Sequence, residues 1–330
     1  MIEVEQLAKH YKVHVRAPGF WNALGSLLHR EFRTVKAVDE ISFHIPEGEI
    51  VGFLGPNGAG KTTTMKLLTG LLHPSSGKLQ VAGFRPYEQK NEFKRRISLV
   101  MGQKSQLIWD VPAAETFLVN KVIYELDDRE YKRHLDGLVE MLKIGEVMTK
   151  PVRQLSLGER MKCELAAALL HKPDLVFLDE PTIGLDVNMQ EVMRAFIAEY
   201  NREFKATILL TSHYMADVTA LCERVLVINH GRLVYDGSMS RLVDRFASHK
   251  HIALQFAGSA EGVDRGRLEQ ELGRSGRLTS FDPPKAVLEV QRDEVSELAA
   301  RLLTKFPVID LTIEEPSMES IISRAFESAG

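Results

Sequence analysis

The run GPNGAGKT at positions 55–62 constrains the fold of this 330-residue chain more than any other segment. It fits the pattern G-x-x-x-x-G-K-[ST], in which glycines let successive backbone N–H groups turn toward phosphate oxygens. Residues 49–54 are typical of a short buried strand, and residues 63–68 of the first turns of a helix. We therefore expect a phosphate-binding loop between a strand and a helix, with the positive end of the helix dipole directed at the phosphate.

The polar positions of this loop have expected roles toward a nucleoside triphosphate such as ATP. The Lys61 ammonium would reach the β- and γ-phosphates, and the Thr62 hydroxyl would ligate Mg²⁺. Five further positions complete the predicted phosphate cradle: Gly55, Asn57, Gly58, Gly60 and Thr63.

Composition sets limits on the class of protein. The net charge of −3 gives no overall attraction to nucleic acid or to an anionic membrane. No stretch reaches the ~18 apolar residues that span a bilayer, and the N-terminus lacks the apolar core of a signal peptide. We expect a soluble chain whose membrane role, if it has one, comes through a partner. Cys163 and Cys222 match no metal or redox spacing, so packing as small apolar residues is favoured.

Strand-like and helical patterns alternate along the first three quarters of the chain. After strands at 2–7 and within 35–54, the sequence predicts buried strands at 93–101, 173–180, 207–211 and 224–229 with helices between them. This alternation favours an α/β fold with a mostly parallel sheet and helices on its faces. A helix-rich stretch at 112–148 predicts an inserted helical subdomain at about 104–165.

An unusual segment at about 13–34 separates the first strands. From Phe20 to Phe32, apolar residues recur at helical spacing and basic residues occupy other positions. Such a helix could lie on a membrane surface. The alternative, which we favour, is a helix that packs on its own domain or on a partner protein.

The pattern changes after residue 246. Strand, helix, strand, strand, helix and strand follow in order over 251–314, which is the β-α-β-β-α-β order of ferredoxin-like domains. Pro316 then opens a final helix. We therefore predict an ATP-binding domain at 1–246 and a small α+β accessory domain at 247–330.

Two acids end one of the predicted buried strands. Asp179 and Glu180 follow four apolar residues, at the carboxyl end where ligands sit in open α/β sheets. Asp179 can hold Mg²⁺ through water, and Glu180 can polarise the attacking water as a general base. The alternative is a solvated acidic strand end, which the upstream phosphate loop makes the less favoured interpretation.

Three further sites stand next to predicted elements. Gln103 and His213 each follow a strand, although a lone histidine is more often a surface or core residue than a catalytic one. Ser156 and Gly158 precede a long helix. The Ser156 hydroxyl and the backbone N–H groups at that helix start would form a second anion site.

In this order the motifs resemble the nucleotide-binding subunit of ATP-binding cassette (ABC) transporters over roughly residues 2–240. The resemblance rests on a Walker A loop, a Q-loop glutamine, an LSGGQ-like signature, a Walker B strand with its glutamate, a D-loop and an H-loop. It implies that Gln103 contacts Mg²⁺ or the attacking water and that His213 contacts the γ-phosphate. It further implies that Asp186 is the D-loop acid. Tyr11 matches the aromatic residue that stacks on adenine; packing beside the sheet is the alternative.

The resemblance also implies a second ATP-binding subunit. Ser156 would face the P-loop of the opposite subunit, so that two ATP molecules lie between two cassettes, with a homodimer expected. The signature departs from the family pattern, because Leu157 replaces a glycine and Glu159 replaces a glutamine. These changes affect the geometry and charge of the second phosphate site. ATPase activity is still expected, because the groups closest to the phosphate chemistry are present.

The tail at 310–319 resembles the C-terminal extension of ABC-2 type drug and antibiotic exporters, and the 13–34 segment resembles one subgroup of them. We therefore expect an ATPase that powers efflux of a small molecule or drug through separate transmembrane permease subunits. It would act at the cytoplasmic face of the inner membrane. Residues 106–112, with Trp109, are a candidate dock for the permease, and subdomain core is the alternative for Trp109.

Two rival functions differ in class. One is a soluble ABC ATPase that acts on ribosomes or nucleic acid; a single cassette without sustained heptads disfavours it, and no nucleic-acid partner is expected. The other is a binding or regulatory module without turnover, and the presence of both Glu180 and His213 argues against it.

Overall fold

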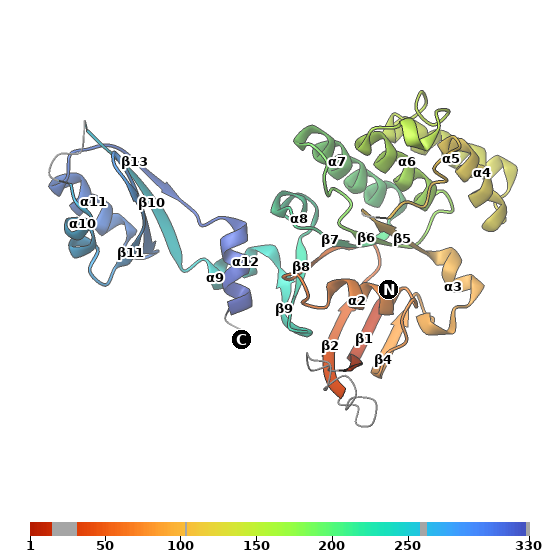
Figure 1. Cartoon of the computed structure of the whole chain (residues 1–330), viewed down its shortest axis with the longest axis horizontal. Helices are drawn as coiled ribbons and strands as arrows, with labels where there is room; N and C mark the ends of the chain where they lie inside the picture. The colour runs from red at the N-terminus through yellow and green to blue at the C-terminus, as the bar shows by residue number, and fades with distance from the viewer. Residues whose placement is uncertain (15–31, 103, 258–262, 328–330) are drawn as a thin grey trace, which may run out of the picture. The chain divides into compact units, whose positions relative to one another are not determined.

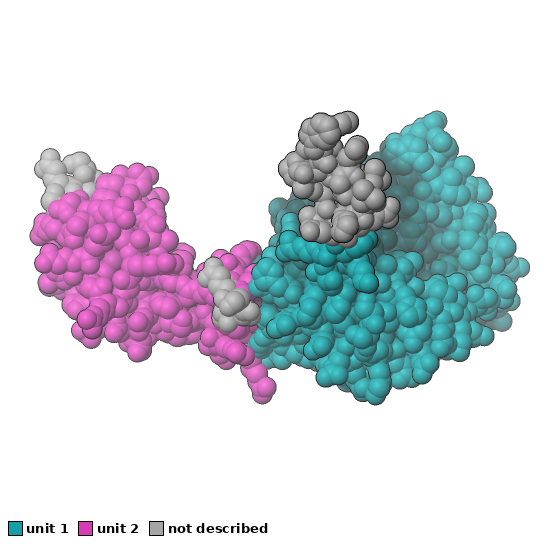
Figure 2. All heavy atoms as spheres, turned by 60° about the horizontal axis from the view of Figure 1, so that its bottom comes forward, with its two compact units in different colours: residues 1–239, 329 teal, residues 240–328, 330 magenta. Residues whose placement is uncertain are grey.

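The computed structural model describes residues 1–14, 32–102, 104–257 and 263–327. The chain divides into two compact units, Met1–Met239 and a second unit that begins at Ser240 (Figure 2). Each unit has its own apolar core. Among the described residues, no helix is long and apolar enough to cross a membrane.

A six-stranded sheet forms the centre of the first unit, in the order β5-β6-β7-β3-β8-β9 (Figure 1). Its first five strands run parallel and only β9 runs antiparallel to its neighbour, which confirms the predicted mostly parallel sheet. The bounds are β3 (Ile50–Leu54), β5 (Ile97–Met101), β6 (Leu175–Asp179), β7 (Thr207–Thr211), β8 (Arg224–Asn229) and β9 (Arg232–Ser238).

A second, antiparallel sheet has the order β2-β1-β4, with β1 (Ile2–His14), β2 (Phe32–Ile45) and β4 (Ser76–Val81). Ile2, Ile41 and Phe43 from this sheet are buried in the same core as Phe53 of β3 and Met65 of α2 (Lys61–Leu68). The phosphate loop therefore joins a strand and a helix that are both anchored in the main core.

Two sequence predictions need correction. Val13 pairs with Arg33 and His14 with Phe32, so the two ends of the 13–34 segment are strand and the predicted helix does not reach Phe32. The backbone ladder between β1 and β2 satisfies the main-chain groups there. Residues 15–31, which carry the rest of the predicted helix, lie outside the described residues.

The other correction concerns residues 93–101. Only Ile97–Met101 is strand, because α3 (Asn91–Arg96) precedes it and buries Phe93 completely in the core. A short 3₁₀ turn, η1 (Pro86–Glu88), lies before α3.

Helices dominate the stretch between β5 and β6, where the sequence predicts an inserted helical subdomain. It holds α4 (Ala113–Ile123), α5 (Asp128–Leu142), the 3₁₀ turn η2 (Val152–Gln154) and the start of α6 (Leu157–Leu169). Asp127 caps α5, and α5 buries Leu138 and Leu142. The remaining helices of the first unit, α7 (Val187–Phe204) and α8 (Met215–Leu221), follow β6 and β7.

The second unit has an antiparallel sheet in the order β11-β12-β10-β13, with α10 and α11 packed through their leucines on its apolar face. This is the predicted ferredoxin-like arrangement. The bounds are α9 (Met239–Phe246), β10 (His249–Phe256), α10 (Arg265–Leu272), β11 (Gly276–Asp282), β12 (Lys285–Gln291), α11 (Val295–Lys305), β13 (Val308–Glu314) and α12 (Met318–Glu327).

The boundary predicted at residue 246 has a direct test. Deletion of 247–330 is expected to leave residues 1–246 with a cooperative thermal unfolding transition, because the buried residues of the main core all lie between Ile2 and Ile228. Circular dichroism during heating measures this. A truncated chain that melts without a cooperative transition would contradict independent folding.

Candidate functional site

The phosphate loop has a backbone that only certain residues can adopt. Gly60 has φ +112°, and a Cβ there would collide with the carbonyl oxygen of Ala37 on β2. Gly58 also has a positive φ of +79°. These conformations turn the loop tightly into the start of α2, where backbone N–H groups lack helical partners.

Lys61 lies across the loop that it follows. Its ammonium donates to the Gly55 carbonyl at 2.5 Å and the Pro56 carbonyl at 3.2 Å, and the residue is 8% exposed. Burial lowers the pKa of this amine, while the nearby carboxylates of Glu180 and Asp179 act in the opposite direction. The cation is therefore fixed between the loop and the two acids.

A cavity of about 160 Å³ opens over the loop. Ala37 and Glu180 line it together with seven loop residues, so the fold brings the predicted general base to the predicted phosphate site. The loop residues are Pro56, Asn57, Gly58, Gly60, Lys61, Thr62 and Thr63.

The two acids at the end of β6 are held by a threonine on the neighbouring strand. The Thr211 hydroxyl donates to Asp179 Oδ1 at 2.6 Å, and the Glu180 N–H donates to the Thr211 hydroxyl and carbonyl at 3.1 Å each. Thr211 is fully buried at the end of β7. Sequence reasoning missed it, because its role depends on the lateral pairing of two strands.

Glu180 meets His213 directly. The distance from Glu180 Oε1 to His213 Nε2 is 2.8 Å. Glu180 has φ +56°, a left-handed conformation that costs a non-glycine residue about 1–3 kcal/mol. The glycine at position 102 leaves room for this conformation of Glu180, because a Cβ on residue 102 would collide with the Glu180 carbonyl oxygen. Such local strain is concentrated at functional sites.

The signature segment forms a capping box at the start of α6. The Ser156 hydroxyl oxygen accepts from the Glu159 N–H at 3.3 Å, and the Glu159 carboxylate accepts from the Ser156 N–H at 2.8 Å. These bonds lower the pKa of the Glu159 carboxyl. Glu159 therefore occupies one of the N–H groups expected to bind an anion, and it adds a negative charge there.

Other predicted residues lie near this segment rather than near the phosphate loop. Gly158 packs against Met189 of α7, and Leu157 packs near Gly184 of the D-loop. Asp186 caps α7 by accepting from the Met189 N–H at 2.9 Å. None of these described residues lines the cavity over the phosphate loop.

Tyr11 lies on β1 opposite Val35, two positions before the cavity-lining Ala37 on β2. Its ring is partly exposed, and the Lys9 ammonium lies 5.3 Å from the ring centroid. The tyrosine is thus near the loop without lining the cavity. Gln103 lies outside the described residues.

Glu164 is a second residue that sequence reasoning missed. It lies on α6 with 4% exposure and accepts from the Gln106 N–H at 2.9 Å and from the Ser105 hydroxyl. A buried carboxylate thus joins the signature helix to the segment that follows position 103.

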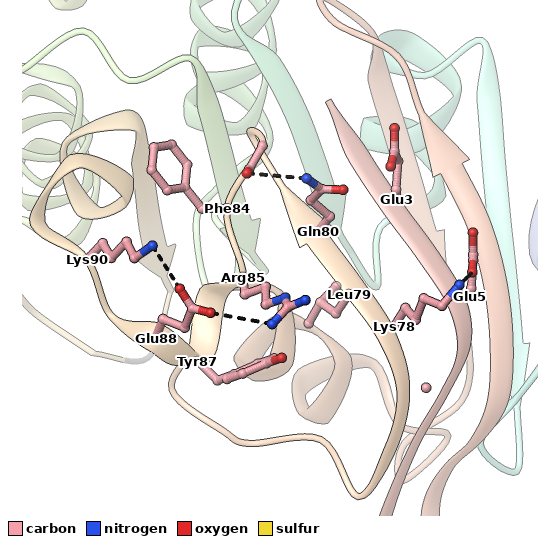
Figure 3. Close-up of a pocket in the computed structure, with 12 residues that line it drawn as sticks. Glu3, Glu5, Lys78, Leu79, Gln80, Phe84, Arg85, Tyr87, Glu88 and Lys90 are labelled. Atoms are coloured by element: carbon pink, nitrogen blue, oxygen red, sulfur yellow. Dashed lines mark hydrogen bonds and ion pairs between the residues drawn. The ribbon is translucent and has the colours of Figure 1, made fainter.

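A larger cavity of about 620 Å³ lies elsewhere, over β1, β4 and η1 (Figure 3). Its lining contains two close ion pairs, Lys78 with Glu5 at 2.9 Å and Lys90 with Glu88 at 3.0 Å. It has no loop of backbone N–H groups of the kind at 55–62. The chemistry of the smaller cavity, and not the size of the larger one, identifies the candidate nucleotide site.

Fold and site together define a P-loop ATPase cassette, and comparison with known families agrees. Residues 38–183 match the family model for ABC transporters, and residues 248–314 match the model for the C-terminal domain of EvrA-like ABC transporters. The chain belongs to the ATP-binding subunits of ABC transporters. It is an ATPase of that family.

Several curated proteins are similar over most of their length. The ABC transporter ATP-binding protein NatA of Bacillus subtilis is 39% identical over 64% of this chain and 86% of its own. The bacitracin transport ATP-binding protein BcrA of Bacillus licheniformis is 32% identical, over 72% and 75%. The Nod factor export ATP-binding protein I of Burkholderia thailandensis is 37% identical, over 74% and 78%.

Solved structures confirm the cassette fold. The structure of cbiO1 from Clostridium perfringens, part of the ABC transporter complex cbiONQ, has a TM-score of 0.60 at 24% identity, over 74% of this chain and 90% of that one. The ADP- and Pi-bound dimer of the ATP-binding cassette MJ0796 has a TM-score of 0.59 at 21% identity, over 72% and 99%.

Proposed function

We propose that this chain hydrolyses ATP to power efflux of a small molecule or drug through separate transmembrane subunits of an ABC-2 type exporter. The contact between Glu180 and His213 beside the phosphate loop is the observation that carries the ATPase part of the proposal. The relatives support the export part, because their names include bacitracin transport, Nod factor export and linearmycin resistance. None of these named relatives favours the ribosome or nucleic-acid alternative.

The residues around the cavity can divide the chemistry between them. Lys61 neutralises charge on the transferred phosphoryl group, and Glu180 accepts a proton from the attacking water. His213 orients Glu180, which lines the cavity, through their 2.8 Å contact. Phosphoryl transfer requires positioning and charge neutralisation more than covalent catalysis, and this set of side chains supplies both.

The donors at the cavity fit Mg²⁺. Thr62 lines the cavity, and Asp179 ends the strand that leads into it with one carboxylate oxygen held by Thr211. Hard oxygen donors of this kind suit Mg²⁺, and the ion would supply neutralisation of phosphate charge when bound. Gln103 is the third proposed ligand.

A second copy of the chain would complete each ATP site. Ser156, Gly158 and Asp186 cluster at the starts of α6 and α7 and do not line the loop cavity of their own chain. In a homodimer they would face the partner's loop. The Glu159 carboxylate at the Ser156 N–H would then weaken attraction to the γ-phosphate from that side, by like-charge repulsion.

The segment at 106–112 is the proposed permease dock, at the cytoplasmic face of the membrane. Ile108 and Trp109 are about half exposed, and the Ile108 N–H donates to Thr116 of α4 at 3.2 Å. Glu164 joins this segment to the signature helix, so a displacement of the dock can reach the signature residues that would face the ATP site of the partner. Four exposed apolar residues on α4 extend the apolar surface of this subdomain: Leu118, Val119, Val122 and Ile123.

The dock can be tested with one exposed side chain. Ile108→Asp is expected to reduce copurification of a coexpressed ABC-2 permease with the tagged chain by roughly tenfold, because a buried unpaired charge costs several kcal/mol at an interface. Quantitative mass spectrometry of detergent extracts measures the ratio. Ile309→Asp, on β13, is the matched control, since both isoleucines are exposed, at 47% and 63%. Equal permease recovery with both variants would contradict the dock.

A further inference from the structure

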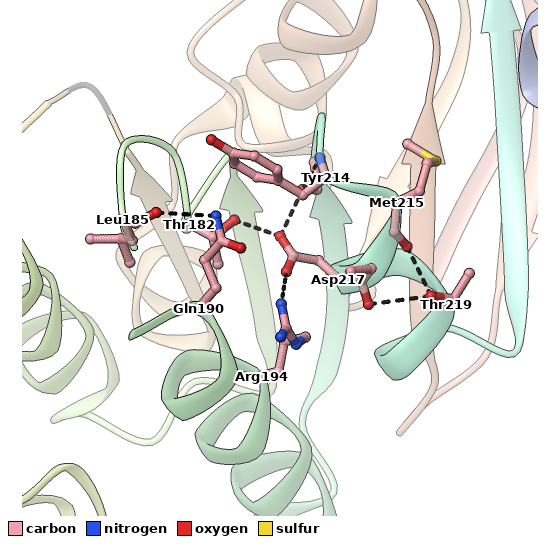
Figure 4. Close-up of polar contacts among 10 residues, drawn as sticks. Thr182, Leu185, Gln190, Arg194, Tyr214, Met215, Asp217 and Thr219 are labelled. Carbon is pink, nitrogen blue, oxygen red and sulfur yellow. Dashed lines mark hydrogen bonds and ion pairs between the residues drawn. The ribbon is translucent and has the colours of Figure 1, made fainter. Parts of the chain in front are cut away.

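Asp217 on α8 is a buried carboxylate that the proposed chemistry does not use. It is 1% exposed and lies four positions after His213. Oδ2 accepts from the Thr182 hydroxyl at 2.5 Å and from the Ser212 hydroxyl at 2.8 Å (Figure 4). Thr182 comes two positions after Glu180, and Ser212 directly precedes His213. One carboxylate oxygen therefore joins the two segments that carry the catalytic pair.

The other oxygen of Asp217 binds α7. Oδ1 accepts from the Arg194 guanidinium at 2.8 Å, which supplies the opposite charge that a buried carboxylate needs. Ser212 is fixed further, because its oxygen also accepts from the Tyr214 N–H at 3.0 Å. Both oxygens of the Asp217 carboxylate therefore accept hydrogen bonds from defined side chains.

Helix α7 connects the same cluster to the D-loop. Gln190, one helical turn before Arg194, donates to the Leu185 carbonyl at 3.2 Å. Asp186, next to Leu185, caps the start of this helix. The H-loop, the segment after Glu180 and the D-loop therefore share one rigid support.

We propose that Asp217 is a positioning residue for ATP hydrolysis, which aligns Glu180 with His213 and couples both to the D-loop. This inference rests on the proposed function. Among the described residues, none of the side chains that hydrogen-bond to the Asp217 carboxylate lines the phosphate loop cavity. Its effect should therefore fall on turnover and leave nucleotide binding unchanged.

Removal of the Thr182 hydroxyl tests the positioning role of Asp217 with little change in side-chain shape. In the full chain, Thr182→Val is expected to lower kcat for ATP about tenfold, since small misplacements at a catalytic pair are costly, and to change KM less than about twofold. Thr182→Ser should restore most of the rate, because the hydroxyl returns. Thr219→Val on α8 is the control for loss of a threonine hydroxyl on the same helix as Asp217, since that hydroxyl donates to carbonyls of α8. Wild-type kcat for Thr182→Val, or equal losses for Val and Ser, would overturn the proposal.

A double-mutant cycle tests whether the effect passes through the carboxylate. Asp217→Leu is combined with Arg194→Met, which removes the shared acceptor and leaves no buried charge unpaired. Adding Thr182→Val to this background should lower kcat by less than about twofold further, because the shared partner is already gone. A full additional tenfold loss would contradict the inference. The wild-type chain should hydrolyse ATP, and Lys61→Ala should abolish this turnover. That result would uphold the proposed ATPase function even if the Thr182 and Asp217 variants contradicted the positioning role of Asp217.

Discussion

Glu180→Gln is expected to bind ATP and almost cease to hydrolyse it. Glutamine has the shape of glutamate but cannot accept the proton of the attacking water, and loss of a general base typically costs 10²–10⁴-fold in rate. An amide oxygen can still accept a hydrogen bond from His213, whose ring nitrogen lies 2.8 Å from the present carboxylate oxygen. The variant should therefore keep the contact between residue 180 and His213 while it loses the general base.

A consequence for assembly follows. If ATP closes two cassettes around it and hydrolysis releases them, the Glu180→Gln chain should accumulate as a dimer with ATP and Mg²⁺ and remain monomeric with ADP. Phosphate release measures the rate, and size-exclusion chromatography with light scattering measures the assembly. Glu130→Gln, an exposed glutamate on α5, is the control for the loss of one charge. Wild-type turnover by Glu180→Gln would show that another group is the base.

Lys61→Ala is expected to abolish ATP binding at micromolar nucleotide. Two effects combine in this substitution. The phosphates lose their buried cationic partner, and the Gly55 and Pro56 carbonyls lose the donor that spans the loop at 2.5 and 3.2 Å. Truncation of one partner of a buried charge pair costs about 2–5 kcal/mol, which corresponds to roughly 30-fold to several thousand-fold in Kd.

Isothermal titration calorimetry with ATP measures the affinity directly. Lys66→Ala, on the same helix α2, is the matched control, since it removes a cation that does not line the cavity. Lys61→Ala with undiminished affinity would refute the role given to the phosphate loop. An intact thermal transition in both variants would exclude unfolding as the cause of a loss.

The sequence predicted much of the site because its key residues stand at the ends of regular elements. Lys61 opens a helix after β3, Glu180 follows β6 and His213 follows β7. The carboxyl ends of parallel strands meet at one edge of a sheet, so linear motifs converge there without further information. The roles of the individual residues stay predictions until the variants above are measured.

The residues that hold this site were not predictable in the same way. Thr211, Asp217 and Glu164 each contact a residue 31 to 59 positions away in the sequence. A buried hydroxyl or carboxylate leaves no periodic pattern, and its partner is set by which strands and helices become neighbours. The helix at 91–96 escaped prediction because a short apolar segment that buries Phe93 does not distinguish a helical turn from a strand by its pattern.

By itself the sequence determined a P-loop ATPase cassette of the ABC type with a small C-terminal domain, since motif spacing and periodicity are local properties of the chain. Only the tertiary structure decided how the site is supported. It placed Glu180 in a left-handed conformation beside His213, closed the start of α6 with Glu159, and joined Ser212, Thr182 and α7 through the Asp217 carboxylate. These features arise from packing between distant segments, where hydrogen-bond partners and burial are set by the whole fold.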